Sequence, residues 1–379
     1  MKKFIIVILL LVIAIPLNVR AEQDVDDVQE IQEELFDKFD FSEVDEMLED
    51  IFQEEKLTFG STIAGLISGD VEFSFDLIKQ FIADQFAYEL QNSKSGMIHI
   101  LLLVIVAAIF SNFSSVFKST QVSEISFSML YMLLLTICLS NFRVLVESAS
   151  TNLGQLMGFM KVLSPVYFLA VAMATGSGTS ITFYQFVLLL IFLVEMVIQN
   201  FLIPLTKIYL ILRILGELSP EIQLTKFADF IHTIVSWSLK TILAGIIGIN
   251  MIQGLLMPAI DSVKRSVIIK GGEAIPVIGD AIGGATELVL GTAVLIKNGI
   301  GVAGMVICLI ICLTPIIQMA VTSLLYQMVA AFMQPISDKR MVNCVSGLAD
   351  GAKLLLQIVF SSGVLFLITI AVVSATTGG

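Results

Sequence analysis

The sequence predicts an all-α, polytopic membrane protein with seven or eight transmembrane helices and a small exported helical region at its N-terminus. Two observations support this fold class. First, 56% of the 379 residues are hydrophobic and only 14% are charged, a composition that is abnormal for a water-soluble core. Second, the segment Glu22–Lys56 holds 16 of the 33 acidic residues and only 2 of the 21 basic ones. A short acidic segment therefore precedes a large apolar body.

Residues 1–21 have the pattern of a signal peptide. The basic pair Lys2-Lys3 precedes the apolar stretch Phe4–Ile15, and Ala21 supplies the small residue before a cleavage site. An uncleaved membrane anchor is the alternative. However, the twelve apolar residues are too few to cross about 30 Å of hydrocarbon at 1.5 Å per residue. We therefore expect cleavage and an extracytoplasmic location for the acidic region, residues 22–96.

The acidic region is predicted to be helical. Apolar residues recur at helical spacing in Val28–Phe39, Val44–Ile51 and Phe75–Leu90. Ser42 and Asp45 form a capping-type pattern at the start of the second stretch. The simpler interpretation of this region is a solvated acidic face, and a docking surface for a basic partner is the alternative.

Residues 97–379 form the predicted polytopic membrane domain. Eight apolar stretches have the length or composition of spans: Ile98–Phe117, Ser126–Phe142, Leu156–Ala174, Tyr184–Ile203, Ile242–Ile260, Gly299–Leu313, Ile316–Met333 and Leu354–Val373. Pro165 interrupts the third stretch, and Pro315 separates the sixth from the seventh. With the acidic region outside, this count puts the basic clusters Lys264–Lys270 and Asp338–Arg340 together on the cytoplasmic side.

Residues 184–260 and 299–373 form a predicted internal repeat, because prolines and a lysine follow one another in the same order in both. Chance similarity between apolar segments is the alternative. The matched positions are Pro204, Pro220 and Lys240 in the first copy, and Pro315, Pro335 and Lys353 in the second.

The segment 274–304 is unusually rich in glycine for a span and unusually apolar for a loop. Its seven glycines each disfavour a lipid-facing helix by about 1 kcal/mol relative to alanine. Irregular backbone at membrane depth survives only where protein or water covers it. We therefore expect a re-entrant or interfacial helical hairpin, in which Gly279 and Gly283 allow close helix packing.

The sequence contains no recognisable catalytic motif. His99 and His232 are far apart, with no carboxylate or cysteine at metal-ligand spacing. Metalloprotease, P-loop and nucleophile-elbow motifs are missing from the sequence. We expect no enzymatic activity, no catalytic residue, no metal and no cofactor. The lack of a basic patch argues against nucleic-acid binding.

Polar residues inside the predicted spans are the remaining candidates. A charged group at membrane depth costs a few kcal/mol and should face protein or water. One interpretation is a lined pore or ion path, and the other is interhelical hydrogen bonding between subunits. The candidate polar or packing positions are Glu195, Gln199, Arg213, Gly279, Gly283, Glu287 and Lys297.

Several short motifs carry a resemblance to a known family. They are Ile275–Gly279, Glu287, Leu295–Asn298 with Gly301, Ser128–Met132, Gln199–Leu205 and Lys226–Asp229. In these motifs the chain resembles the stage III sporulation protein AE family of endospore-forming bacteria, from about Phe75 to the C-terminus.

This resemblance implies a non-enzymatic membrane subunit of the trans-envelope channel complex between mother cell and forespore. Such a complex is needed for endospore development and late forespore gene expression. The implied location is the mother-cell membrane around the forespore. The implied partners are membrane lipid, other membrane proteins of the same stage III sporulation operon and, indirectly, stage II sporulation protein Q. A secondary transporter or permease for a small solute, with Glu195 as the coupling carboxylate, remains the alternative.

Overall fold

The computed structural model describes residues 38–51, 58–68, 75–116, 120–175, 189–218, 224–272 and 279–376. The predicted signal peptide therefore lies outside the described residues. The helices are α3 (Ser42–Ile51), α4 (Phe59–Ser68), α5 (Phe75–Val116), α6 (Thr120–Thr175), α8 (Ile203–Leu218), α9 (Leu224–Gly272), α10 (Gly279–Met333) and α11 (Lys339–Thr376). A further helix, residues 189–197, continues through a π-helix, η1 (Ile198–Leu202), into α8. All described elements are helical, so the all-α prediction is confirmed.

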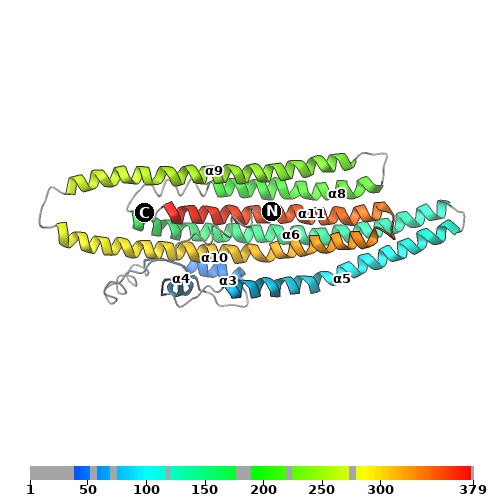
Figure 1. The fold of residues 1–379 in the computed structure, drawn as a ribbon, viewed down its shortest axis with the longest axis horizontal. Helices are drawn as coiled ribbons and strands as arrows, with labels where there is room; N and C mark the ends of the chain where they lie inside the picture. The colour runs from blue at the N-terminus through cyan, green and yellow to red at the C-terminus, as the bar shows by residue number, and fades with distance from the viewer. Residues whose placement is uncertain are drawn as a thin grey trace.

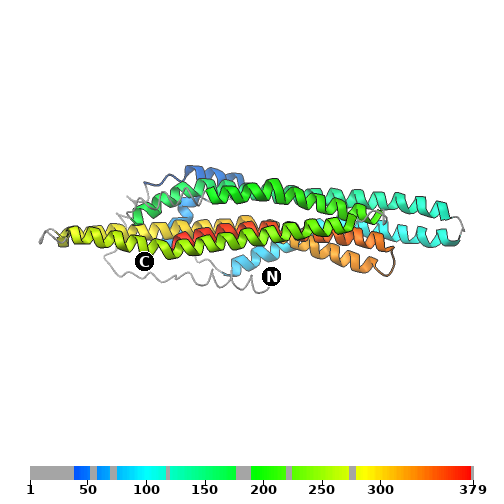
Figure 2. The ribbon, with the colours of Figure 1, turned by 90° about the horizontal axis from the view of Figure 1, so that it is seen from above.

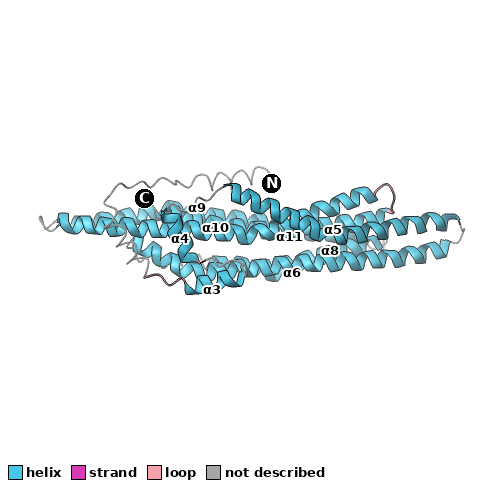
Figure 3. Cartoon of the chain, turned by 90° about the horizontal axis from the view of Figure 1, so that it is seen from below, coloured by secondary structure: helices cyan, strands magenta, loops and turns pink. Residues whose placement is uncertain are grey.

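The long helices lie side by side along one axis and form an elongated bundle (Figures 1 and 2). α11 is central, because it packs against α6, α8, α9 and α10. A short turn, residues 334–338, joins α10 to α11, and we call this end of the bundle the turn end. The hairpin of α5 and α6 projects beyond the other helices there (Figure 1). The described parts of the bundle are helices joined by loops and turns (Figure 3).

Within the residues that the structure describes, five helices are long and apolar enough to cross a membrane. They are Ile125–Ala174, Leu189–Glu217, Leu224–Ile249, Gly291–Met333 and Lys339–Ser374. The predicted seven or eight spans are not confirmed. One reason is that two pairs of predicted spans merge, because α6 continues from the second predicted span into the third and α10 runs through Pro315. The 56 residues of α6 extend about 84 Å, more than twice the thickness of the hydrocarbon layer.

A side chain from a neighbouring helix compensates for Pro315. Proline lacks an N–H, so the carbonyl of Ile311, four residues earlier, loses its helical donor. The buried Asn152 of α6 supplies the replacement, since its Nδ2 donates to the Ile311 carbonyl oxygen at 2.6 Å. Neighbouring helices commonly satisfy the backbone around a proline in a membrane helix. This bond explains why α10 continues where the sequence predicted a break.

The small helices α3 and α4 pack against α6 and α10. Val44 and Leu48 of α3 are fully buried there, and Met47 lies over Gly158, where an added Cβ would come within 2.6 Å of the Met47 Cε. Four acidic side chains of α3 are exposed on its outer face: Glu43, Glu46, Glu49 and Asp50. The predicted acidic helix is therefore held rigidly against the bundle, and the predicted domain boundary at residue 96 lies within α5.

Aspartates, and not Ser42, cap these two helices. Asp40 Oδ1 accepts the Ser42 N–H at 3.0 Å, and hydrogen bonds from the Ser42 side chain and backbone lower the pKa of the Asp40 carboxyl. The Asp45 N–H donates to the Phe41 carbonyl, while the Asp45 carboxylate accepts the N–H of Phe59 at the start of α4. Carboxylates at helix N-termini satisfy free N–H groups and complement the helix dipole.

Two predictions about the second half of the chain need correction. The segment 274–304 contains no turn between Gly279 and Gly304, because these residues form the first part of the uninterrupted α10. The expected hairpin is therefore wrong for those residues, and the depth of this segment in a membrane stays a prediction. The two basic clusters also lie at opposite ends of the bundle, because α10 runs its whole length between them (Figure 1).

We predict that Asn152→Leu destabilises the bundle by about 1–3 kcal/mol, the cost of leaving the buried Ile311 carbonyl without a donor. The measurement is the melting temperature of the purified chain in detergent, followed by circular dichroism. Thr151→Leu, at the exposed neighbouring position, is the matched control and should melt like the wild type. Equal melting temperatures for both variants would show that Asn152 does not support α10.

Candidate functional site

The first candidate site is built around the π-helix that precedes Pro204. Proline removes a backbone donor, and its ring crowds the carbonyl four residues earlier, so a regular α-helix is disfavoured at this point. The chain widens to a π turn at Ile198–Leu202, where the N–H of Ile203 donates to the carbonyl of Ile198. Such π turns within helices occur frequently at functional sites. Here the turn begins just after Glu195.

Glu195 is a buried carboxylate, with 2% of its surface exposed. Its Oε1 accepts a hydrogen bond from Gln199 Nε2 at 2.8 Å, so two of the predicted site residues are in contact. No lysine, arginine or histidine in the described part of the chain forms a salt bridge with it. The structure encloses this carboxylate within its own chain, and this burial argues against a role for Glu195 in direct contact with another subunit.

Glu195 faces a small cavity between three elements: the helix 189–197, α9 and α11. Apolar side chains form most of its wall, including Ile246 of α9. Ser362 and Thr369 of α11 add two hydroxyl groups. The cavity measures about 10 Å³, which is room for about one water molecule. The sequence did not single out Ser362 or Thr369, because a serine or threonine in an apolar helix does not indicate which neighbouring element its side chain will contact.

The hydroxyl of Ser362 has no hydrogen-bond partner among the described residues, although the side chain is 1% exposed. The Thr369 hydroxyl donates to the Leu365 carbonyl at 2.8 Å, so its remaining lone pairs are available to a ligand. The cavity thus combines an unpaired carboxylate with hydroxyl oxygens that can accept hydrogen bonds or coordinate an ion.

Lys297 has a structural role at the end of α11. It is fully buried, and its Nζ donates to the carbonyl oxygen of Ser374 at 3.2 Å. The last carbonyls of a helix lack donors and carry partial negative charge, so a lysine there stabilises the helix end. Tyr167 provides a further contact to α11 nearby, since its hydroxyl donates to the Ile370 carbonyl at 3.5 Å.

Arg213 belongs to a polar cluster near the turn end. Its Nη1 lies 3.4 Å from Asp229 Oδ1 of α9, and the neighbouring Glu217 accepts a hydrogen bond from Asn343 Nδ2 of α11 at 3.0 Å. These contacts tie α8 to α9 and α11. The cluster joins helices within one chain, and the predicted hydrogen bonding between subunits stays a prediction.

The remaining predicted positions lie at the start of α10. Gly279, Gly283 and Glu287 are on its first turns, and their side-chain surroundings lie outside the described residues. Gly154 has no atom within 4 Å of an added Cβ, so it makes no close helix contact in the described structure.

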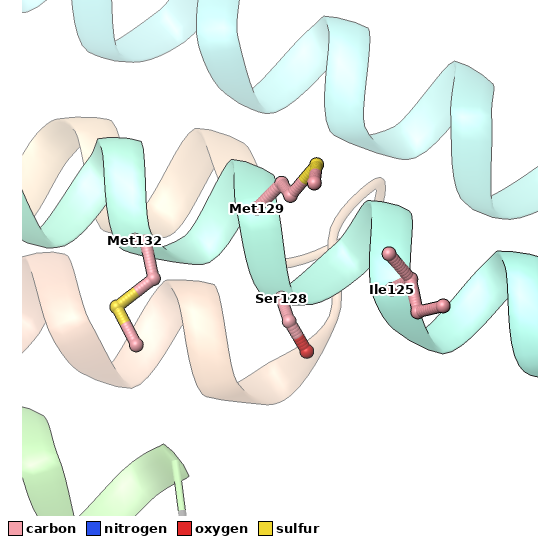
Figure 4. A pocket seen from close by; sticks show the side chains of 4 residues that line it. All are labelled: Ile125, Ser128, Met129 and Met132. Atoms are coloured by element: carbon pink, nitrogen blue, oxygen red, sulfur yellow. The ribbon is translucent and has the colours of Figure 1, made fainter.

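A second hollow lies on the exposed face of α6 in the projecting hairpin. Ile125, Ser128, Met129 and Met132 line it, and all four come from one face of this single helix (Figure 4). The hollow is open and mostly apolar, and it contains no charged group. Within the described residues, no group of three histidine, cysteine or carboxylate side chains is placed to hold a metal ion. The Glu195 cavity is therefore the stronger candidate site.

Comparison with known proteins identifies the family. The profile of the family described as stage III sporulation protein AE matches residues 57–377. This chain belongs to that family. A curated relative, stage III sporulation protein AE of Bacillus subtilis (strain 168), is 26% identical over 281 residues, which cover 74% of this chain and 70% of the relative. No solved structure matches the chain. Membership of this family confirms the resemblance seen in the sequence and indicates a role in sporulation.

We predict that Lys297→Met loosens the end of α11, because the Ser374 carbonyl loses a charged donor worth about 1.5–3 kcal/mol. Hydrogen exchange of the peptide that covers residues 366–376 should accelerate. Lys353→Met, at an exposed position of the same helix, is the control and should leave this exchange unchanged. Normal protection of the peptide in Lys297→Met would exclude the capping role.

Proposed function

We propose that this chain is a non-enzymatic membrane subunit of a channel complex that crosses the envelope between mother cell and forespore. In this role it supports endospore development and late forespore gene expression. The observation that carries the proposal is the family match over residues 57–377. The five apolar helices, consistent with a multi-pass membrane protein, agree with a subunit embedded in the mother-cell membrane.

The outer face of α3 offers a surface for a partner. Val44 and Leu48 anchor the helix to the bundle, so the opposite face is presented on a rigid base. Its exposed side chains are acidic: Glu43, Glu46, Glu49 and Asp50. A basic surface on another membrane protein of the same sporulation operon would complement this face. Stage II sporulation protein Q would then be reached indirectly, through that partner.

The exposed basic residues at the turn end and the acidic residues of α3 support one orientation, although it leaves the basic cluster Lys264–Lys270 at the opposite end of the bundle. Lys226, Lys339 and Arg340 are exposed near the turn end, whereas α3 and α4 lie in the other half of the bundle (Figure 1). Lysine and arginine favour the cytoplasmic side of a membrane protein. We therefore propose that the turn end faces the mother-cell cytoplasm and that the acidic helices face the space between the two cells.

A secondary transporter or permease for a small solute is the second candidate function. The specific observation in its favour is Glu195, a buried carboxylate without an ion-pair partner in the described residues, since intramembrane carboxylates often lie on transport paths. The two functions differ in what the chain does alone. A transporter reconstituted by itself in vesicles should move its solute, whereas a channel subunit should require its partners.

We predict that neutralising the acidic face of α3, by Glu43→Gln, Glu46→Gln, Glu49→Gln and Asp50→Asn together, weakens association with the operon partners. The reason is the loss of electrostatic attraction to a basic surface. The measurement is co-purification of those proteins with the tagged chain from detergent-solubilised membranes of sporulating cells. We expect recovery to fall several-fold and to become less sensitive to salt.

Asp84→Asn, at an exposed position of α5, is the control and should leave recovery unchanged. Full recovery with the neutralised helix would exclude α3 as the docking face. A wild-type chain that recovers none of these proteins would contradict the subunit proposal itself.

A further inference from the structure

Glu195 is the sole charged residue on the stretches of chain that surround its cavity. The wall comes from the helix 189–197, from α9 and from α11, and apart from Glu195 all of its side chains are uncharged. In the sequence, no other charged residue and no histidine stands in 162–206, 241–260 or 354–379. The elements packed around the cavity therefore supply no counter-charge to this carboxyl group.

The nearest charged residues on the same elements are three lysines. Lys240 lies six residues before the α9 residue of the wall, and Lys353 lies nine residues before the first α11 residue of the wall. These separations amount to about 9 Å and about 14 Å along the helices. Lys207 follows Glu195 by twelve residues. All three lysines are exposed, and none forms a salt bridge with Glu195 in the described structure.

The cavity does not fit a metal cation in place of a counter-charge. Ser362 and Thr369 lie two helical turns apart on α11, about 10.5 Å along the axis, so their hydroxyl groups cannot join Glu195 around one small ion. The remaining wall is apolar. An unpaired ion in such surroundings costs several kcal/mol, and a buried carboxyl group avoids this cost by holding a proton.

The polar groups of the cavity suit a neutral carboxylic acid. Gln199 Nε2 donates to Glu195 Oε1 at 2.8 Å, which leaves the other oxygen to carry the proton. An O–H on that oxygen is a donor, and Ser362 offers an unpaired hydroxyl in the same cavity. The cavity measures about 10 Å³, enough for about one water molecule to bridge them.

The segment that carries Glu195 lies at the edge of the bundle. Residues 189–202, which we call the η1 segment, bury Glu195, Ile198 and Leu202 on their inner side. Large apolar side chains on the outer side are exposed: Leu189, Phe192, Leu193, Met196, Val197 and Phe201. The π turn and Pro204 interrupt regular helical hydrogen bonding at the end of this segment. The η1 segment can therefore move away from α11 without disrupting the centre of the bundle.

We propose that Glu195 is a proton-binding site that controls the packing of the η1 segment. The carboxyl group is neutral while the segment packs against α9 and α11. When the proton passes to water or buffer, the carboxylate that is left attracts water into the cavity, and the segment separates from α11. This inference goes beyond the channel role and does not depend on it, because every group involved belongs to one chain.

The first test is infrared spectroscopy of the full purified chain in detergent at neutral pH. The difference spectrum between the wild type and Glu195→Gln should contain the C=O stretching band of a protonated carboxylic acid, which shifts in D₂O. The matched control is Glu147→Gln, which removes an exposed carboxylate paired with Arg143. Its difference spectrum should contain the bands of an ionised carboxylate instead.

Gln199→Leu is a second variant that retains Glu195. It removes the donor to Oε1, so it should shift the acid band without abolishing it. This variant identifies the band as that of Glu195 even where Glu195→Gln fails to fold.

The second test is hydrogen exchange of the peptide that covers residues 189–202. A rise from mildly acidic to mildly alkaline pH should accelerate this exchange several-fold more in the wild type than in Glu195→Gln, whose side chain stays neutral. The melting temperature should fall in parallel. The carboxyl group is protonated in the folded chain and ionised in the unfolded chain, so the unfolded state binds fewer protons and stability decreases as pH rises.

Three results would overturn the proposal. The first is a difference spectrum of Glu195→Gln with only ionised-carboxylate bands, like that of Glu147→Gln. The second is an acid band that Gln199→Leu leaves unshifted. The third is an equal response to pH of the peptide 189–202 in the wild type and in Glu195→Gln.

Discussion

The need to satisfy every backbone polar group in apolar surroundings is the constraint on which this structure depends. Water is absent from the hydrocarbon layer, so a carbonyl that loses its helical donor there must find another. Pro315 creates such a carbonyl at Ile311, and Asn152 satisfies it from the neighbouring helix. Pro204 instead changes the helix itself, which widens into η1. A contact with α6 thus lets α10 continue past Pro315, whereas Pro204 produces a local irregularity beside the buried carboxylate of Glu195.

The central position of α11 links the structural contacts to the candidate site. Its C-terminal end is held by Lys297 of α10, and its N-terminal part contacts Glu217 of α8 through Asn343. Between these two anchors, Ser362 and Thr369 face the Glu195 cavity. Side chains on a helix fixed at both ends are held more precisely than those on loops.

The acidic helix α3 constrains how the bundle lies in a membrane. It packs on α6 around Gly158, within a segment that has the length and composition of a span. Its outer carboxylates must remain in water, because burial of unpaired charges in hydrocarbon is costly. The face of α6 around Gly158, which α3 covers, therefore cannot lie in the hydrocarbon layer. Since α6 is more than twice as long as the hydrocarbon layer is thick, part of it extends outside the membrane, where α3 is available to a partner protein.

The sequence by itself determined the helical fold class, the acidic and apolar division of the chain, the family, and Glu195 and Gln199 as two candidate positions one helical turn apart. These follow from composition, periodicity and local spacing. Only the tertiary structure decided that Pro165 and Pro315 do not end helices, that residues 279–304 contain no hairpin turn, and that Ser362 and Thr369 complete the cavity. The continuation of α10 past Pro315 depends on a partner from a distant part of the chain. Asn152 lies 159 residues from the Ile311 carbonyl that it satisfies. No local sequence pattern around Asn152 or Ile311 indicates that contact.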